Sequence, residues 1–325
     1  MMTTIKKIPV ILNYENASHR GPGKVVQNLE KGLDLLGIEH GKTHLFRSDV
    51  RAYEGFLQTV PDMFGKWSEK DSHSLVGPNL FVLPSDWTSK QCKNYKHYIV
   101  PSQWVADLYR MFPVLDHATI DVWPVGIDTE KWDTCARAVR TVGPLADLKC
   151  LLYYKNRNES DLKLVKRIIE KYKIEYRLIE YGKYKEDQLW DACGWANMGV
   201  VLTDTESQGI AYMEMLSSDL PLFVFNKSWW DNEGKMNKVP ASSVPYFDER
   251  CGEVCYNVDL GLFERFIDKV KNWKYSPRKY ILENHTLTLS AQNYYNLLAK
   301  YQTYEDESVD NNSIVQDGEI SKEVP

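Results

Sequence analysis

Two glutamates in the segment ESQGIAYMEMLSSDLP (206–221) have the type and spacing of residues that bind a hydroxylated ligand. Glu206 lies in a polar loop after the apolar run MGVVLT (198–203), and Glu214 follows eight positions later in a segment with helical periodicity. A carboxylate accepts hydrogen bonds from the hydroxyls of a ribose or another sugar. Two solvated glutamates can show the same spacing by chance, so their context has to decide between these interpretations.

That context is a strand, a loop and the start of a helix. Ligands of open α/β sheets bind at the carboxyl ends of the strands, where the loop around Glu206 lies. The first turn of a helix has N–H groups without partners and a partial positive charge, so it binds phosphate. Gly209 carries no side chain. We therefore predict that an anion approaches the amides of Gly209, Ile210 and Ala211.

The segment NYENASHRGPGKVV (13–26) predicts a second anion site, because a strand, a loop with two glycines and a helix again follow one another. It is not a Walker A loop, since Val25 follows Gly23-Lys24 where Ser or Thr is required. A dinucleotide fingerprint would need glycine at Val26. ATP and NAD are thereby disfavoured, while a plain turn before a core helix stays open as the alternative.

A pair of basic residues follows the apolar run LKCLLYY (148–154). Lys155 and Arg157 are expected at the carboxyl end of that strand, on the same edge of the sheet as the Glu206 loop. Two cations at this edge can neutralise a diphosphate. Basic loop residues are more often simply solvated, so this pair alone is a weak signal.

The amino-acid composition excludes several classes of function. The 325 residues include 45 acidic and 40 basic ones, for a net charge of −5, so no basic excess indicates a nucleic-acid partner. The apolar runs are too short to span a bilayer, and the first strand-like run is too short for a secretory signal, so we expect a cytoplasmic protein without a transmembrane segment. Six scattered cysteines, of which Cys251 and Cys255 alone are close in sequence, predict no zinc site.

Strand-like and helix-like segments alternate twice along the chain, which predicts parallel sheets covered on both faces. The expected strands are 7–14, 43–47, 79–84, 97–101, 119–126, 148–154, 175–181, 198–203 and 220–226. The expected helices are 23–37, 102–112 with Ser102 as N-cap, 160–172, 185–196, 209–218, about 259–272 and about 286–301. Residues 48–76 read as irregular, TVGPLAD (141–147) as a linker, and the acidic tail from Tyr304 as disordered.

Four motifs together resemble the retaining glycosyltransferases of the GT-B fold, in particular glycosyltransferase family 4. They are Gly21-Pro22-Gly23 after the first strand, IVPSQW (99–104), VWPVGIDTEKW (122–132) and the E-x7-E segment 206–214. The resemblance covers about residues 8–300. It implies an α/β protein of GT-B architecture, with two doubly wound Rossmann-like domains facing across a cleft. We expect an N-terminal acceptor-side domain over 1–142, a donor-binding domain over 143–303 whose last helix crosses back, and the tail over 304–325.

The resemblance also implies the roles of single residues. Glu206 is expected to contact the transferred sugar as the catalytic residue, and Glu214 to bind the donor ribose. The other expected donor-binding residues are Gly23, Lys155, Arg157, Tyr184, Ser207, Gly209, Ile210 and Ala211, with the loop 181–184 beside the base. The sequence departs from the family in having Tyr-Lys-Asn-Arg where Gly-Arg is usual, and no histidine in VLPSDW (82–87).

The implied activity is transfer of a sugar from a nucleotide diphosphosugar, a UDP- or GDP-sugar, to a hydroxyl of a glycan or another acceptor. No cofactor or metal is required, since the sequence has no Asp-x-Asp segment to hold one. Two alternatives stay open: a nucleotide-sugar-binding protein without transfer activity, and a sugar-nucleotide epimerase on the same architecture.

Overall fold

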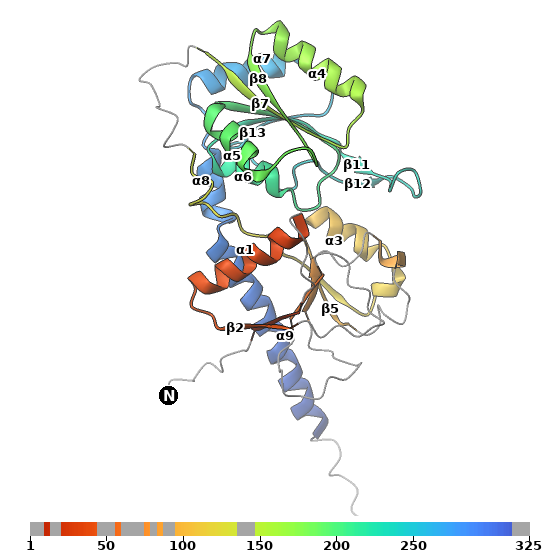
Figure 1. Ribbon diagram of the computed structural model, residues 1–325. Helices are drawn as coiled ribbons and strands as arrows, with labels where there is room; N and C mark the ends of the chain where they lie inside the picture. Colours follow the sequence, from red (N-terminus) through yellow and green to blue (C-terminus); the bar gives the residue numbers. More distant parts are fainter. Residues whose placement is uncertain are drawn as a thin grey trace, which may run out of the picture.

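The protein consists of two α/β units stacked on each other (Figure 1). The computed structural model describes residues 10–13, 21–43, 56–59, 75–78, 83–86, 95–134 and 147–313. The predicted fold class, an α/β protein with two Rossmann-like units that face each other, is confirmed. No helix among these residues is long and apolar enough to cross a membrane.

The N-terminal unit contains a sheet with the strand order β2-β1-β3-β4-β5-β6. Most neighbours pair in parallel, but β3 is antiparallel to both β1 and β4, which the prediction of purely parallel sheets did not include. The strands are β1 (Val10–Asn13), β2 (His40–Thr43), β3 (Phe56–Thr59), β4 (Leu75–Pro78), β5 (His97–Val100) and β6 (Thr119–Val122). Its helices are α1 (Gly21–Leu35) and α3 (Gln103–Arg110), with short 3-10 turns at Pro84–Asp86 and Pro113–Leu115.

One sequence prediction in this unit is wrong, and two others fall largely outside the described residues. The expected strand 79–84 is one of these, since the structure does not describe residues 79–82; Pro84, its last residue, begins a 3-10 turn. The stretch 48–76 is not wholly irregular, since it contains β3 and the start of β4. The expected strand 43–47 shares only Thr43 with β2 (His40–Thr43), and its residues 44–47 lie outside the described part.

The C-terminal unit is built on an all-parallel sheet with the order β13-β10-β9-β7-β8. Its strands are β7 (Lys149–Lys155), β8 (Glu175–Glu180), β9 (Met198–Thr203), β10 (Leu222–Phe225) and β13 (Gly252–Cys255). Its helices are α4 (Glu159–Lys171), α5 (Glu186–Trp195), α6 (Ile210–Ser217), α7 (Leu260–Lys271) and α8 (Pro277–Asn284). The predicted strand at 198–203 is confirmed, and α8 and β13 were missed.

Side chains alternate along the central strands and form two cores. Leu151 and Val201 pack with α5 and α6, whereas Leu152 and Val200 pack with α4 and α7. Strands with apolar residues on both faces are typical of a parallel sheet covered by helices on both sides. In Figure 1, α4 and α7 lie above the sheet, and α5 and α6 lie below it, toward the N-terminal unit.

The last helix, α9 (Leu287–Ser313), returns to the N-terminal unit and packs along α1 (Figure 1). Gly32 of α1 allows this close approach, because a Cβ at this position would lie 2.4 Å from the carbonyl oxygen of Leu287. The indole N–H of Trp123 donates to the carbonyl of Ser290 at 2.9 Å. The backbone helix continues to Ser313, beyond Tyr304, where the sequence predicts a disordered tail to begin.

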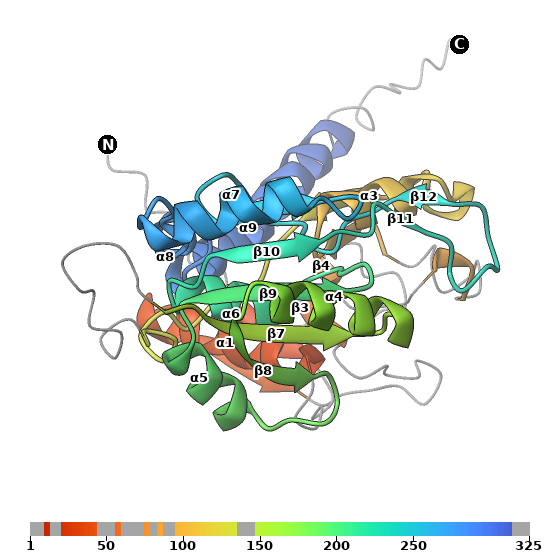
Figure 2. The same ribbon diagram turned by 90° about the horizontal axis from the view of Figure 1, so that it is seen from above.

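A small hairpin links the two units on one side. Its strands, β11 (Trp229–Trp230) and β12 (Val239–Pro240), follow β10 in the C-terminal unit and lie beside α3 of the N-terminal unit in both views (Figures 1 and 2). Trp230 and Val239 pack into the apolar cluster that contains α3. The hairpin therefore fixes part of the contact between the units.

Candidate active site between the two units

Glu206 lies in the loop between β9 and α6, and contacts from two directions position its backbone. Its N–H donates to the carbonyl of Ser242 at 2.8 Å. Its carbonyl accepts a hydrogen bond of 2.9 Å from the indole N–H of Trp104, in the first turn of α3. The loop is therefore bound both within its own unit and by the N-terminal unit.

The Glu206 side chain is buried and forms an ion pair with Lys155. The Lys155 ammonium, at the carboxyl end of β7, lies 2.8 Å from Oε2 of Glu206. It also lies 4.5 Å from the centroid of the Tyr181 ring, a cation–π distance. Burial raises the pKa of Glu206, and the Lys155 charge opposes that rise. The structure thus brings together two residues that the sequence predicts at one edge of the sheet.

Glu214 is the second buried carboxylate, and its partner comes from the other unit. Lys24, in the first turn of α1, forms an ion pair with Glu214, whose side chain is 3% exposed. Burial raises the pKa of Glu214 to about 7, although the Lys24 charge lowers it. The carboxylate that the sequence assigns to a ribose is thus neutralised by a lysine across the interface.

The Lys24–Glu214 pair belongs to a chain of four charges. Lys24 also contacts Oε2 of Glu186, at the start of α5, at 2.6 Å, and Glu186 in turn pairs with Lys131. These contacts raise the pKa of Lys24 against the opposing effect of burial, and lower that of Glu186. The predicted cleft is therefore crossed by direct ion pairs.

The N-terminus of α6 lies between the two glutamates. Gly209 is its N-cap, with a left-handed φ of 71°, and no side chain caps the first turn. A Cβ at Gly209 would lie 2.0 Å from the ring of Tyr212. The left-handed backbone at position 209 and the nearby Tyr212 ring thus both require glycine. The amides of Ile210 and Ala211 belong to a helix turn that has no side-chain acceptor.

Two tyrosines lie near the charged pairs. Tyr153 on β7 is buried, and its ring meets Tyr184 edge-on with 6.3 Å between centroids. Burial raises the pKa of both tyrosines, that of Tyr184 to about 12. The charges of Glu214 and Lys24 also act on Tyr184, and that of Glu206 acts on Tyr153. Tyr184, predicted beside the base, therefore lies near the ribose-binding candidate.

Arg157 has a different environment from Lys155. Its guanidinium donates to the carbonyls of Thr203 at 3.2 Å and Phe225 at 3.3 Å, and to Asp161 at 3.0 Å. These contacts join the carboxyl ends of β9 and β10 to α4. Of the two predicted cations, Lys155 is the one paired with a site carboxylate in this structure.

The remaining predicted residues lie near these groups. Gly23 is buried in the first turn of α1, directly before Lys24, and Ser207 is exposed in the loop directly after Glu206. Sequence reasoning did not assign Lys24, Trp104, Tyr153 or Glu186 to the site. Lys24 gave the strongest available signal, because it follows Gly23 at the predicted anion-binding turn. The Ser102 N-cap was predicted, and it occupies that position without a side-chain hydrogen bond to the helix.

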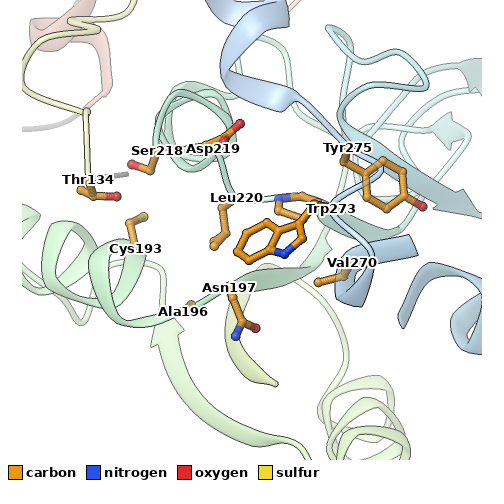
Figure 3. A pocket seen from close by; sticks show the side chains of 11 residues that line it. Thr134, Cys193, Ala196, Asn197, Ser218, Asp219, Leu220, Val270, Trp273 and Tyr275 are labelled. Carbon is orange, nitrogen blue, oxygen red and sulfur yellow. The ribbon is translucent and has the colours of Figure 1, made fainter. Parts of the chain in front are cut away.

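One further feature lies outside this site. A pocket of about 50 Å³, shown in Figure 3, is lined by residues that include Asn197 and Pro221, directly before β9 and β10. It therefore lies at the amino ends of the strands, whereas Glu206 and Lys155 lie at the carboxyl ends.

Among the described residues, no cluster of three or more His, Cys, Asp or Glu side chains has the arrangement to hold a metal ion.

Comparisons with known proteins give limited likenesses. No protein-family model and no curated protein sequence matches the chain. Among solved structures, the chain is similar to sucrose-phosphate synthase from Thermosynechococcus elongatus, with 14% identity, a TM-score of 0.41, and coverage of 64% of this chain and 58% of that one. It is also similar to the wall teichoic acid polymerase TagF, with 13% identity, a TM-score of 0.33, and coverage of 68% and 60%. The chain thus spans about three fifths of the length of each.

Proposed function

We propose that this protein is a retaining glycosyltransferase that moves a sugar from a nucleotide diphosphosugar to a hydroxyl of a glycan or another acceptor. One observation carries the proposal. Two buried glutamates flank a helix N-terminus without a side-chain cap, at the carboxyl end of a parallel sheet and against the second unit. The family 4 resemblance in the sequence assigns the same two residues to the donor.

The residues around this helix match the parts of such a donor. Glu214 accepts the ribose hydroxyls, and Tyr184 lies close enough to Glu214 to border the nucleoside. The first-turn amides of α6 and the ammonium of Lys155 provide positive charge for the diphosphate. Glu206, which is paired with Lys155, contacts the transferred sugar.

The chemistry then depends on orientation and charge. As the bond between the anomeric carbon and the diphosphate breaks, negative charge grows on the leaving oxygen. Preorganised amides and a cation at that point stabilise the charge more than mobile water does. The facing unit excludes water and so limits hydrolysis of the donor.

Substitution of the two glutamates tests the proposal. We expect Glu206→Ala to slow donor turnover by roughly 100-fold or more, in line with the loss of a preorganised active-site group. Glu214→Ala should weaken donor binding by roughly 10- to 100-fold, the range for hydrogen bonds to a charged group. Release of nucleoside diphosphate from UDP-glucose and GDP-mannose is the readout. Glu249→Ala, at an exposed position of the same unit, is the matched control.

Near wild-type turnover in both active-site variants would contradict the proposal. Donor binding by the wild type without any sugar release would instead favour a nucleotide-sugar-binding protein. A thermal-shift panel of nucleotide sugars identifies the base and the sugar, since a ligand that binds only the folded state raises the melting temperature.

A further inference from the structure

Gln208 is a buried side chain of the Glu206 loop for which the proposed function gives no role. The residue is 7% exposed. Both its amide nitrogen and its amide oxygen are buried, and neither forms a hydrogen bond with any residue that the structure describes. A buried polar group without a partner costs roughly 1–3 kcal/mol, so this arrangement requires an explanation.

The backbone around Gln208 is fixed on both sides. Two residues earlier, the N–H and the carbonyl of Glu206 are bonded to Ser242 and to Trp104. The next residue is Gly209, the left-handed N-cap of α6. The backbone of Gln208 is therefore held at the junction of strand and helix, between Glu206 and the N-cap of α6.

The chemistry of the amide selects the kind of ligand group. It offers two N–H donors and a carbonyl acceptor and has no charge. Charged groups of a ligand are better matched by Lys155 and by the helix N-terminus. A sugar hydroxyl both donates and accepts hydrogen bonds, so neighbouring hydroxyls match the two ends of one amide.

We propose that Gln208 is a specificity-determining residue that hydrogen-bonds to hydroxyls of the transferred sugar, an inference that rests on the proposed function. The sugar supplies the partners that the amide lacks among the described residues. Gln208 then discriminates between sugars, and the nucleotide part of the donor is bound without it.

Replacing the amide by an apolar chain of similar length tests this assignment. The probes are UDP-glucose and GDP-mannose, each compared with its own free nucleoside diphosphate by titration calorimetry. We expect Gln208→Met to lower the affinity for the nucleotide sugar roughly tenfold, as for the loss of one or two neutral hydrogen bonds. Its affinity for UDP or GDP should change less than about twofold. Gln292→Met, at an exposed glutamine of α9, is the matched control.

A second measurement uses the unaltered protein, so it does not depend on the folding of a variant. Donor analogues that lack one sugar hydroxyl at a time should lose affinity for wild type at one or two positions. The Gln208→Met variant should bind these analogues with the same affinity as the parent donor.

The outcomes separate the two proposals. Equal loss of affinity for nucleotide sugar and nucleoside diphosphate, or no loss for either, would overturn the role of Gln208 alone. That role would also be overturned if wild type bound every single deoxy analogue as tightly as the parent donor. Failure of the wild-type protein to bind any nucleotide sugar would overturn the proposed function itself.

Discussion

The ammonium of Lys24 on α1 forms an ion pair with the carboxylate of Glu214 on α6, so one α/β unit neutralises the most buried acidic side chain of the facing unit's site. A ribose that binds to Glu214 has to share this carboxylate with Lys24 or displace it. Glu186 lies 2.6 Å from the same ammonium and offers Lys24 a second acceptor. Under the proposed function, the contact between the units and the binding of a nucleotide are therefore coupled through Glu214.

Removing Lys24 should destabilise the protein in a pH-dependent way. Lys24→Met leaves Glu214 buried without its counter-charge, which costs roughly 3–5 kcal/mol when the carboxyl is ionised. Since burial already raises the pKa of Glu214 to about 7, protonation relieves this cost at low pH. We expect a small loss of unfolding free energy at pH 5.5 and a large one at pH 8.5, measured by urea denaturation.

Lys31→Met is the control for this substitution. Lys31 lies on the same helix, its side chain is 60% exposed, and it pairs with Asp128 at 2.7 Å. An exposed pair of this kind contributes about 1 kcal/mol or less. Equal losses for the two variants, or no recovery when Glu214→Gln is added to Lys24→Met, would show that the pair has no special role.

Donor affinity should depend on the protonation of Glu214. The carboxylate accepts ribose hydroxyls, whereas the protonated carboxyl has lost acceptor capacity. The raised pKa, about 7, therefore predicts that donor affinity increases as the pH rises through that value. Calorimetric titration between pH 5.5 and 8.5 gives the profile. A Glu214→Gln protein with the same pH profile as wild type would assign the effect to another group.

The sequence predicted the elements that bear the site better than the rest of the fold. The continuous apolar run 198–203 has the pattern of a strand buried on both faces, and Gly209 marks the helix start. By contrast, the stretch 48–76, expected to be irregular, contains β3 and the start of β4, and β4 is defined by its pairing of Leu75 with His97 in β5. Pairing with a distant strand is not encoded in local propensity.

The same distinction applies to the site residues. Lys155 ends β7 and Glu206 follows the neighbouring strand β9, so their proximity follows from the parallel topology. Lys24 and Trp104 belong to the other unit, and their contacts with Glu214 and Glu206 depend on how the units are oriented. Nothing within a few residues of Lys24 specifies that orientation.

Gly209 should tolerate no side chain, for two separable reasons. Its φ of 71° disfavours any residue with a Cβ, and that Cβ would collide with the ring of Tyr212. Gly234, in the hairpin loop, has a φ of 80° and open space around it. We expect Gly234→Ala to cost about 1 kcal/mol and Gly209→Ala clearly more, in thermal or urea unfolding. Equal costs would mean that the Tyr212 ring moves aside freely.

Arg157 should act mainly by holding the strand ends in place. Its guanidinium bonds to three acceptors in different directions: Asp161 and the carbonyls of Thr203 and Phe225. A lysine keeps the charge, but its ammonium cannot reproduce the planar arrangement of donors. We therefore expect Arg157→Lys to lower the unfolding free energy by about 1–2 kcal/mol.

The matched control is Arg167→Lys, at an exposed position of α4, which should change stability by about 0.5 kcal/mol or less. Urea unfolding measures both variants, and donor titration is run alongside. If Arg157→Lys unfolds like the control but binds UDP-glucose or GDP-mannose more weakly, the guanidinium belongs on the diphosphate. Lys155 would then share this role with Arg157, because both residues lie at the carboxyl end of β7 and their positive charges would act on one leaving group.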